Sequence, residues 1–369
     1  MPVRQQSPAF RSPPHQLGTH GTPRRNPYDI GSLVSRSNRD HDKITDPIKS
    51  LPFRHPSSLL PLSLSSSSLK MSLEAGSLFD LRGAIALVTG GGTGLGLTAA
   101  LALASNGAKV YISGRRQQRL DEAVAEYNPT LQSGKLVAVQ GDVSSKEDLG
   151  RIASLIEKEE GKLHILVNNA GIEGPMTKFP DPSSLSAADL SSAHLASESF
   201  EEWDKLFRIN TSSIFFSTMT FLPLLSASHS HPLSASTQQG KWTASVINIT
   251  SISGIVKTSQ FHYAYNASKA AANHLTQMLA HELRFNSNTA IRVNALAPGL
   301  FSSEMTSGGK SDKGKTNPDD VTGHNNPAGR VGSESEYAQL VLLLAANQFI
   351  TGQIVAVDGG FISAVPSSR

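Results

Sequence analysis

Short apolar runs and longer stretches of helical periodicity alternate along most of this 369-residue chain. The runs have the length of strands, whereas the stretches between them repeat apolar residues every three or four positions, as helices do. We expect strands at residues 84–89, 109–113, 135–140, 164–168, 245–250, 291–296 and 353–357. We expect helices at residues 95–106, 117–127, 146–159, 200–225, 263–285 and 334–346.

Strands that alternate with helices in this way are joined by right-handed crossovers, which makes the sheet parallel and covers both of its faces with helices. The pattern therefore predicts an α/β fold, a single doubly wound Rossmann domain with a seven-stranded parallel sheet. We place this domain at residues 76–366.

Three connections are longer than ordinary loops. Residues 177–199 and 300–326 follow the fourth and sixth strands, at the edge where open α/β sheets bind ligands, so they are candidates for pocket walls and a mobile lid. A tolerated surface insertion is an equal alternative for residues 177–199, and it is the favoured interpretation of residues 226–240.

The first 70 residues differ from the rest of the chain in composition. They hold half of its prolines, no glutamate and the serine run Ser65–Ser68, so they cannot bury enough apolar surface to fold. We predict a disordered tail over residues 1–75. Met71 would make a natural start, which favours a gene-model extension; an organelle transit peptide is the alternative, because the tail is rich in Arg and Ser and poor in acids.

Composition also excludes several classes of protein. The chain has no cysteine, which rules out disulfides, thiolate catalysis and cysteine-bound metal, and we expect no metal site. No apolar run reaches the roughly 18 residues of a membrane span. The net charge of +3 comes from the tail, where ten Lys and Arg face four Asp, so we expect no nucleic-acid binding. We expect a cytoplasmic protein, or a mitochondrial one if the tail is a transit peptide.

A glycine-rich loop joins the first strand to the first helix. It reads Thr89-Gly90-Gly91-Gly92-Thr93-Gly94-Leu95-Gly96, a T-G-x-x-x-G-x-G spacing. Glycines permit a sharp turn and let the backbone approach a pyrophosphate, whose charge the helix N-terminus stabilises. A lone glycine loop is often only a tight turn, but between a strand and a helix of this alternation it predicts a nucleotide site.

The end of the second strand bears on the choice of nucleotide. An NAD site places a carboxylate here, about 20 residues beyond the loop, on the ribose 2′-hydroxyl. This chain has Gly114 followed by Arg115, whose guanidinium can pair with a 2′-phosphate. NADP(H) is therefore favoured over NAD(H), with a solvated arginine at a helix start as the other interpretation.

Two more strand ends carry candidate contacts to the cofactor. Asp142 follows the third strand, where its carboxylate can reach an adenine edge. Asn169, Ala170 and Gly171 follow the fourth strand, where small and amide side chains can line the path of the cofactor. Turn chemistry alone also favours Asp, Asn and Gly at such positions.

Tyr265 and Lys269 stand four residues apart in an expected helix, so both side chains leave the same face one turn apart. An ammonium near a phenol favours phenolate and should pull the tyrosine pKa down from about 10. Such a tyrosine can exchange a proton with a carbonyl or alcohol oxygen.

These motifs together resemble those of the short-chain dehydrogenase/reductase family over about residues 80–362. The matching positions are Thr89–Gly96, Asp142, Asn168–Gly171, Asn210, Ser251, Tyr265 with Lys269, and Pro298-Gly299. Within the family the chain looks most like beta-ketoacyl reductases of the rhamnolipid type, which it matches at Val246–Ile249, Tyr263–Tyr265, Pro298–Thr306 and Gly329–Gly332.

The resemblance implies roles for four catalytic residues. Tyr265 would protonate a ketone oxygen as hydride arrives from the nicotinamide, and Lys269 would lower the pKa of the phenol and contact the nicotinamide ribose. Ser251 would hold the substrate oxygen, and Asn210 would complete a proton path through water. Ser253 is a second candidate for the serine, but Ser251 begins the S-x-x-G motif of the family.

The resemblance also places Pro298, Gly299 and Ser303 at the nicotinamide end, with Ser303 where threonine is usual. Thr93 stands where many NADP-using members carry a basic residue, which leaves Arg115 to support NADP(H). We expect an NADPH-dependent reductase of ketones, with a beta-ketoacyl group as one candidate substrate. An NAD-dependent secondary-alcohol dehydrogenase and a non-catalytic nucleotide sensor are the alternatives.

Relatives commonly form tetramers through the helices that correspond to residues 200–225 and 263–285. The resemblance therefore implies a homo-oligomer, either a tetramer or a dimer. The substrate is a small carbonyl or alcohol compound that residues 172–199 and 300–326 would enclose, and neither segment identifies it. Tyr263 is expected as a pocket wall, and His262 as a helix-start or lining residue.

Overall fold

The structure is a computed structural model of the whole chain, and it describes residues 73–177, 185–231, 233, 242–287, 289–307, 317–320 and 326–365. Positions 1–72 of the expected tail lie outside the described residues, so its disorder and its origin stay predictions. Parts of the three long connections lie outside them as well.

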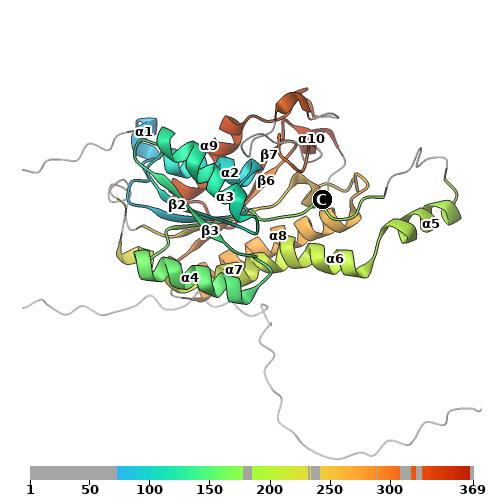
Figure 1. Cartoon of the computed structure of the whole chain (residues 1–369). Coiled ribbons are helices and arrows are strands. Elements are labelled where there is room, and N and C mark those ends of the chain that lie inside the picture. Colours follow the sequence, from blue (N-terminus) through green and yellow to red (C-terminus); the bar gives the residue numbers. More distant parts are fainter. Residues whose placement is uncertain are drawn as a thin grey trace, which may run out of the picture. The chain divides into compact units, whose positions relative to one another are not determined.

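Seven parallel strands form one sheet in the order β3-β2-β1-β4-β5-β6-β7 (Figure 1). They are β1 (Ile85–Thr89), β2 (Lys109–Gly114), β3 (Lys135–Gln140), β4 (Ile165–Asn168), β5 (Ser245–Ile249), β6 (Arg292–Pro298) and β7 (Ile354–Val357). Because the strand order runs outward in both directions from β1 and β4, a crevice opens at the carboxyl ends of these two strands. The expected doubly wound Rossmann domain is confirmed.

Helices cover both faces of the sheet. The described helices are α1 (Ala75–Leu78), α2 (Gly94–Ser105), α3 (Gln117–Tyr127), α4 (Lys146–Glu160), α5 (Ala187–Ser197), α6 (Phe200–Phe207), α7 (Ser213–Ala227), α8 (Tyr263–His281), α9 (Glu334–Ala346) and α10 (Phe361–Ala364). Figure 1 shows α2, α3 and α9 on one side of the sheet and α4, α7 and α8 on the other. None of the helices in the described part of the chain is both long and apolar enough to cross a lipid bilayer.

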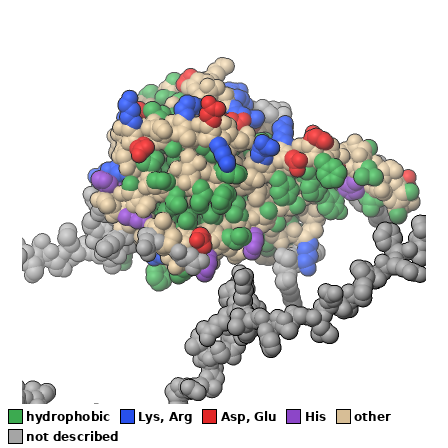
Figure 2. Space-filling view, turned by 90° about the horizontal axis from the view of Figure 1, so that it is seen from below, with side chains coloured by type: hydrophobic (Ala, Val, Ile, Leu, Met, Phe, Trp, Pro, Cys, Tyr) green, Lys and Arg blue, Asp and Glu red, His purple; other side chains and the backbone are tan. Residues whose placement is uncertain are grey.

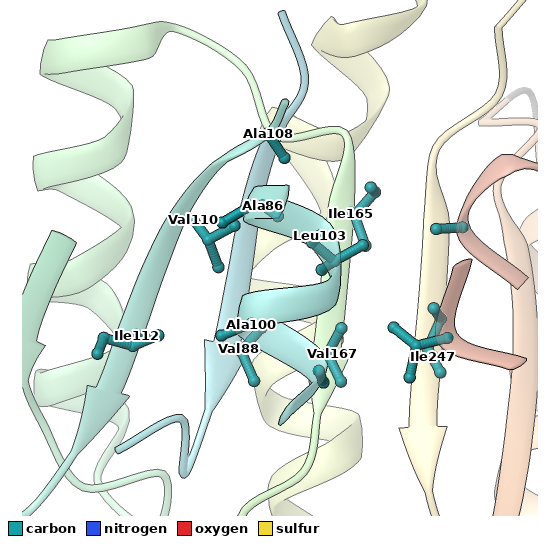
Figure 3. Packing of buried hydrophobic residues seen from close by; sticks show 14 of the residues in the cluster. Ala86, Val88, Ala100, Leu103, Ala108, Val110, Ile112, Ile165, Val167 and Ile247 are labelled. Carbon is teal, nitrogen blue, oxygen red and sulfur yellow. The ribbon is translucent and has the colours of Figure 1, made fainter. Parts of the chain in front are cut away.

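Strand β1 is buried along its whole length because it packs against helices on both faces. Ala86 and Val88 belong to the core cluster that includes Ala100 and Leu103 of α2 (Figure 3). The alternate residues of β1 belong to a second cluster, on the side of α4, α7 and α8. This two-sided burial is typical of parallel sheets and explains why the strands read as continuous apolar runs.

The structure differs from the sequence-based expectation at several places, among them the end of the helix expected at 263–285, where α8 gives way to the π-helical turn η7 (Glu282–Asn286). Residues 177–199, expected as irregular, include α5, which begins where the Ser186 hydroxyl accepts a hydrogen bond from the Asp189 N–H at 3.2 Å. None of the residues of α5 is buried, so no apolar periodicity announces the helix. The long helix expected at 200–225 is instead α6 and α7, joined by the π-helical turn η3 (Arg208–Ser212).

Hydrophobic side chains gather in the middle of one outer face, which is the lower face of Figure 1 and carries α4 and α7 (Figure 2). Phe215 and Phe216 on α7 are 42% and 37% exposed, and the Lys146 ammonium lies 4.6 Å from the centre of the Phe216 ring. Met278 on α8 is 55% exposed. Exposed apolar side chains that cluster in this way favour contact with another molecule.

Candidate active site

The glycine loop turns sharply between β1 and α2. Gly90 and Gly94 have φ values of +65° and +53°, which L-residues with a side chain rarely adopt. A Cβ at Gly96 would lie 2.1 Å from the carbonyl oxygen of Gly90, so only glycine fits there. The loop therefore keeps its backbone bare and brings it to the start of α2, as the sequence predicted.

Hydrogen bonds tie the end of β1 to the end of β4. The Thr89 hydroxyl accepts hydrogen bonds from the N–H groups of Asn169, at 3.0 Å, and Ala170, at 3.1 Å. The Asn169 side chain donates in return to the carbonyl oxygens of Thr89 and Gly90. Two of the expected cofactor motifs thus form one rigid unit at the crevice.

A cavity of about 370 Å³ opens at this edge of the sheet. The predicted residues that line it are Gly90, Gly94, Leu95, Gly96, Arg115, Asp142, Asn169, Ala170, Gly171, Ser251, Tyr265, Lys269, Pro298, Gly299 and Ser303. Two predicted residues lie behind its wall, because Thr89 is 2% exposed and Asn210 is 1% exposed. The structure therefore brings the sequence candidates together around one space.

Ser251, Tyr265 and Lys269 meet at the cavity, where β5 ends and α8 begins. The Ser251 side chain is close enough to the phenol of Tyr265 to lower its pKa slightly. The Lys269 ammonium lies 5.7 Å from the centre of the Tyr265 ring. Ser253, the other candidate serine, instead donates to the Gln260 side chain at 3.1 Å and does not line the cavity, so the geometry favours Ser251.

The pKa values of this pair are shifted toward the neutral forms. Burial raises the pKa of Tyr265 to about 12, against a smaller lowering by the Ser251 side chain. Burial also lowers the pKa of Lys269 to about 8. The expected lowering of the tyrosine pKa is therefore wrong for this structure, because desolvation of the phenolate dominates and the Glu173 carboxylate raises the pKa further.

Asn210 lies on the π-helical turn η3, behind the cavity wall. Its side-chain oxygen accepts from the N–H of Ile172 at 2.9 Å, and its amide donates to the Ile172 carbonyl at 2.9 Å and to the Ser268 hydroxyl at 3.2 Å. A Cβ built on Gly171 would lie 3.3 Å from the Asn210 oxygen and 3.7 Å from the Lys269 nitrogen. Asn210 thus braces the segment after β4 against the helix that carries Tyr265.

Three arginines just after the end of β2 line the cavity. Arg115 lines it as expected, and among the described residues its guanidinium has no ion-pair partner. Arg116 and Arg119 also line the cavity but were not singled out from the sequence, although Arg116 precedes α3 directly and Arg119 lies in its first turn. Arg119 is paired with Glu122 on the same helix at 2.9 Å. A phosphate group fits such a cationic cluster.

Asp142 and Ser303 line the cavity with their polar groups already engaged. The Asp142 carboxylate accepts hydrogen bonds from the N–H of Ser144 at 2.8 Å and from its hydroxyl at 2.7 Å. The Ser303 hydroxyl lies 3.1 Å from that of Thr306. These bonds fix both side chains, so each presents a defined surface to the cavity.

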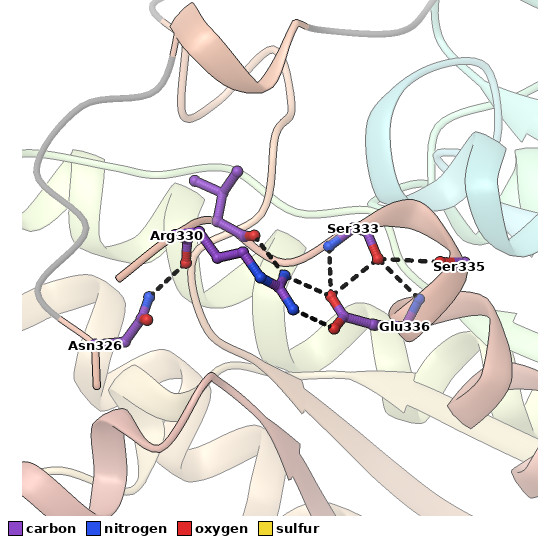
Figure 4. Close-up of polar contacts among 6 residues, drawn as sticks. Asn326, Arg330, Ser333, Ser335 and Glu336 are labelled. Atoms are coloured by element: carbon purple, nitrogen blue, oxygen red, sulfur yellow. Dashed lines mark hydrogen bonds and ion pairs between the residues drawn. The ribbon is translucent and has the colours of Figure 1, made fainter. Parts of the chain in front are cut away.

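The segment that leads into α9 supports the cavity wall from outside. Arg330 binds both carboxylate oxygens of Glu336 at 2.9 and 2.6 Å, and Ser333 caps the helix (Figure 4). The Arg330 guanidinium holds the pKa of Glu336 far below its usual range. A Cβ at Gly332 would lie 2.3 Å from the ring of Phe301, which lines the cavity. The Gly329–Gly332 motif therefore positions this wall.

Aromatic and charged residues lie near Tyr265 at the start of α8. The ring of Tyr263 contacts the ring of His194 on α5, with the centroids 5.2 Å apart. His262 lies 3.8 Å from the Glu173 carboxylate, and its ring contacts Tyr265 edge-on. Tyr263 is half exposed and does not line the described cavity, so its role as a pocket wall stays a prediction.

The strand order and the glycine loop after β1 define the Rossmann class of α/β folds. A family model described as short chain dehydrogenase matches residues 84–314. The chain therefore belongs to the short-chain dehydrogenase/reductase family, a family of oxidoreductases, as its motifs predicted.

Individual relatives agree with this assignment. The short-chain dehydrogenase/reductase PhomF of Diaporthe leptostromiformis is 40% identical over 307 residues, which cover 82% of this chain and 99% of the relative. The rhamnolipids biosynthesis 3-oxoacyl-(acyl-carrier-protein) reductase of Pseudomonas aeruginosa is 36% identical over 288 residues, 77% of this chain and 98% of that protein. The solved structure of the Pseudomonas aeruginosa RhlG/NADP active-site complex is similar with a TM-score of 0.62 and 31% identity, and covers 77% of this chain and 98% of its own. The predicted likeness to the rhamnolipid type is confirmed.

Proposed function

We propose that this protein is an NADPH-dependent reductase that converts a ketone to a secondary alcohol. The observation that carries the proposal is that Ser251, Tyr265 and the buried Lys269 line one cavity together with the glycine loop. A serine hydroxyl and a phenol that line the same cavity can both hydrogen-bond to one carbonyl oxygen. A beta-ketoacyl group remains one candidate substrate, supported by the relative from Pseudomonas aeruginosa.

The residues of the cavity fit a phosphorylated dinucleotide. Bare backbone at Gly90–Gly96 and the N-terminus of α2 suit a pyrophosphate, and the arginine cluster suits a 2′-phosphate. A bound nicotinamide would supply the hydride for the carbonyl carbon. Thr89 does not line the cavity. It would affect the cofactor only by holding the glycine loop against the end of β4 through its hydrogen bonds.

The chain's own residues would handle the proton. Tyr265, whose raised pKa keeps it protonated near neutral pH, would give its proton to the carbonyl oxygen and become phenolate. Ser251 would donate a hydrogen bond to the same oxygen as negative charge develops on it. Lys269 in its ammonium form would stabilise the phenolate. Asn210 would hold the segment after β4 in place through its hydrogen bonds to Ile172.

The test is the rate of cofactor oxidation by the purified full chain, with NADPH and with NADH, against a panel of ketones that includes beta-ketoacyl thioesters. Replacing Tyr265 by Phe should lower ketone reduction by about 100-fold or more, as expected for a lost general acid. Tyr263→Phe is the matched control, because residue 267 is alanine and gives Tyr263 no lysine one turn on. Full turnover by Tyr265→Phe would refute the mechanism.

An NAD-dependent secondary-alcohol dehydrogenase is the second candidate. Thr93 in the glycine loop carries no charge, and Arg116 is already paired with a carboxylate, so two potential contacts to a 2′-phosphate are missing or occupied. A preference for NADH over NADPH in the same assay would select this candidate.

We also propose a homo-oligomer that is formed through α7 and α8. The exposed Phe215, Phe216 and Met278 support it, since they are apolar side chains on the two helices where the family resemblance implies the contact between subunits. We further place the protein in the cytoplasm, and its domain at residues 76–366.

A further inference from the structure

Glu304 holds Arg116 at the rim of the cavity. The two side chains form an ion pair with 2.7 Å between Arg116 Nη2 and Glu304 Oε2. The Thr93 hydroxyl donates to the same carboxylate oxygen at 3.1 Å and lies 3.5 Å from Arg116 Nη2. We call these three residues the Glu304 clasp. It joins the glycine loop, the turn before α3 and the segment after β6, all of which line the cavity.

The clasp lies where that last segment approaches the glycine loop. A Cβ built on Gly94 would lie 3.3 Å from the Cβ of Ser303, so the two backbones are nearly in contact beside Thr93 and Glu304. This close approach places the Glu304 carboxylate next to the arginines of the cavity. Of these, Arg119 is paired within its own helix, and Arg115 has no ion-pair partner among the described residues.

We propose that Glu304 reduces the preference for NADP(H) over NAD(H) by competing with the 2′-phosphate of NADP(H) for Arg116. The inference rests on the proposed dinucleotide site. A carboxylate and a phosphate both bind a guanidinium through its forked N–H groups. Arg116 can therefore pair fully with only one of the two anions at a time. NAD(H), which has a 2′-hydroxyl in place of the phosphate, does not compete for Arg116, so the ion pair between Arg116 and Glu304 stays intact.

The exposure of the pair indicates that the exchange is feasible. The Arg116 side chain is 59% exposed and that of Glu304 is 21% exposed. Ion pairs in contact with water contribute little to stability, so a dianionic phosphate can displace the carboxylate. Glu304 then lowers the affinity for NADP(H) by a modest factor and leaves that for NAD(H) unchanged.

The experiment is calorimetric titration of the full chain with 2′,5′-ADP, which carries the 2′-phosphate, and with 5′-AMP, which lacks it. Neither probe holds a nicotinamide, so the readout is independent of catalysis. Glu304→Gln should strengthen binding of 2′,5′-ADP by about threefold to fivefold and leave 5′-AMP unchanged. Glu304→Ala serves as the second variant and should act in the same direction.

The decisive test repeats the Glu304→Gln exchange in a protein that already carries Arg116→Gln. Arg116→Gln alone should weaken binding of 2′,5′-ADP, and the double variant should bind this probe no more tightly than Arg116→Gln does. An equal gain for 5′-AMP, a gain that persists without Arg116, or weaker binding of 2′,5′-ADP to Glu304→Gln would each overturn the proposal. A chain that binds both probes but reduces no ketone would refute the proposed reductase and leave this inference intact.

Discussion

The Lys269 ammonium donates a hydrogen bond of 2.9 Å to the carbonyl oxygen of Ile249, the last residue of β5. This bond anchors the amine between β5 and α8, where the lysine is only 5% exposed. Burial lowers its pKa to about 8, so the ammonium persists at neutral pH and is lost in mildly alkaline solution. The tyrosine beside it, with a pKa raised to about 12, stays protonated over the same range.

These two values predict the pH dependence of ketone reduction. We expect kcat/KM to be level near neutral pH and to fall as the pH rises above about 8, because Lys269 then loses the charge that stabilises the phenolate. Lys269→Arg should move this fall to higher pH, since a guanidinium stays charged. A rate that rises through pH 8, or an unchanged fall in Lys269→Arg, would contradict the assignment.

Arg115 gives a prediction about cofactor affinity. Because its guanidinium lines the cavity without an ion-pair partner among the described residues, Arg115→Ala should raise KM for NADPH by about tenfold and barely change KM for NADH. Arg151→Ala is the matched control, since Arg151 is paired with Asp148 and does not line the cavity. Equal changes in KM for the two cofactors would show that Arg115 does not contact the 2′-phosphate.

The fold could be predicted from the sequence wherever side chains are buried on a regular spacing. Helices α3 and α9 begin and end at the expected residues, because each carries a buried stripe. Helix α5 was missed for the opposite reason, since it buries no residue and only its Ser186 cap marks its start. The π-helical turn η3 was also missed, as no propensity distinguishes its residues from the helices on either side.

The candidate site was predictable where the chemistry is local in sequence. The glycine loop and the Tyr265–Lys269 pair are short motifs, and the structure brings both to the cavity. The Glu304 clasp could not be foreseen, because Thr93 and Glu304 are 211 positions apart and meet only through the tertiary fold. The direction of the Tyr265 pKa shift was missed because burial is a property of the assembled site.

Asn210 gives a prediction about stability. Asn210→Ala removes the side chain that satisfies both the N–H and the carbonyl of Ile172, and it should lower the free energy of unfolding by about 1–3 kcal/mol. Asn273→Ala is the control. It is also buried, but its amide donates only one hydrogen bond, to the Gly254 carbonyl at 3.3 Å, and its side-chain oxygen has no partner in the described part of the chain, so the loss should be smaller. Urea unfolding measures both, and equal losses would deny Asn210 its bracing role.

The apolar face of α7 gives a prediction about assembly. Phe215→Glu should reduce the molecular mass measured by sedimentation, because a carboxylate would have to be desolvated at the interface. Leu195→Glu on α5 is the control, since Leu195 is 79% exposed and lies away from α7 and α8 in sequence. A Phe215→Glu protein with the mass of the unaltered chain would place the interface elsewhere.

Buried His164 predicts loss of stability in acid. Its Nδ1 accepts from the N–H of Ile85 at 3.1 Å and its Nε2 lies 3.0 Å from the His231 carbonyl, so the ring fits as a neutral group with the proton on Nε2. Burial lowers its pKa from 6.5 to about 4, so the unfolded chain takes up the proton first as the pH falls. The stability that neutral His164 contributes is therefore complete above about pH 6.5 and is lost toward pH 4, by up to about 3 kcal/mol. His164→Gln, which can accept and donate without titrating, should flatten the melting temperature over this range. The exposed His274→Gln should not, and a His164→Gln protein with the same acid slope as the unaltered chain would show that other groups cause the loss.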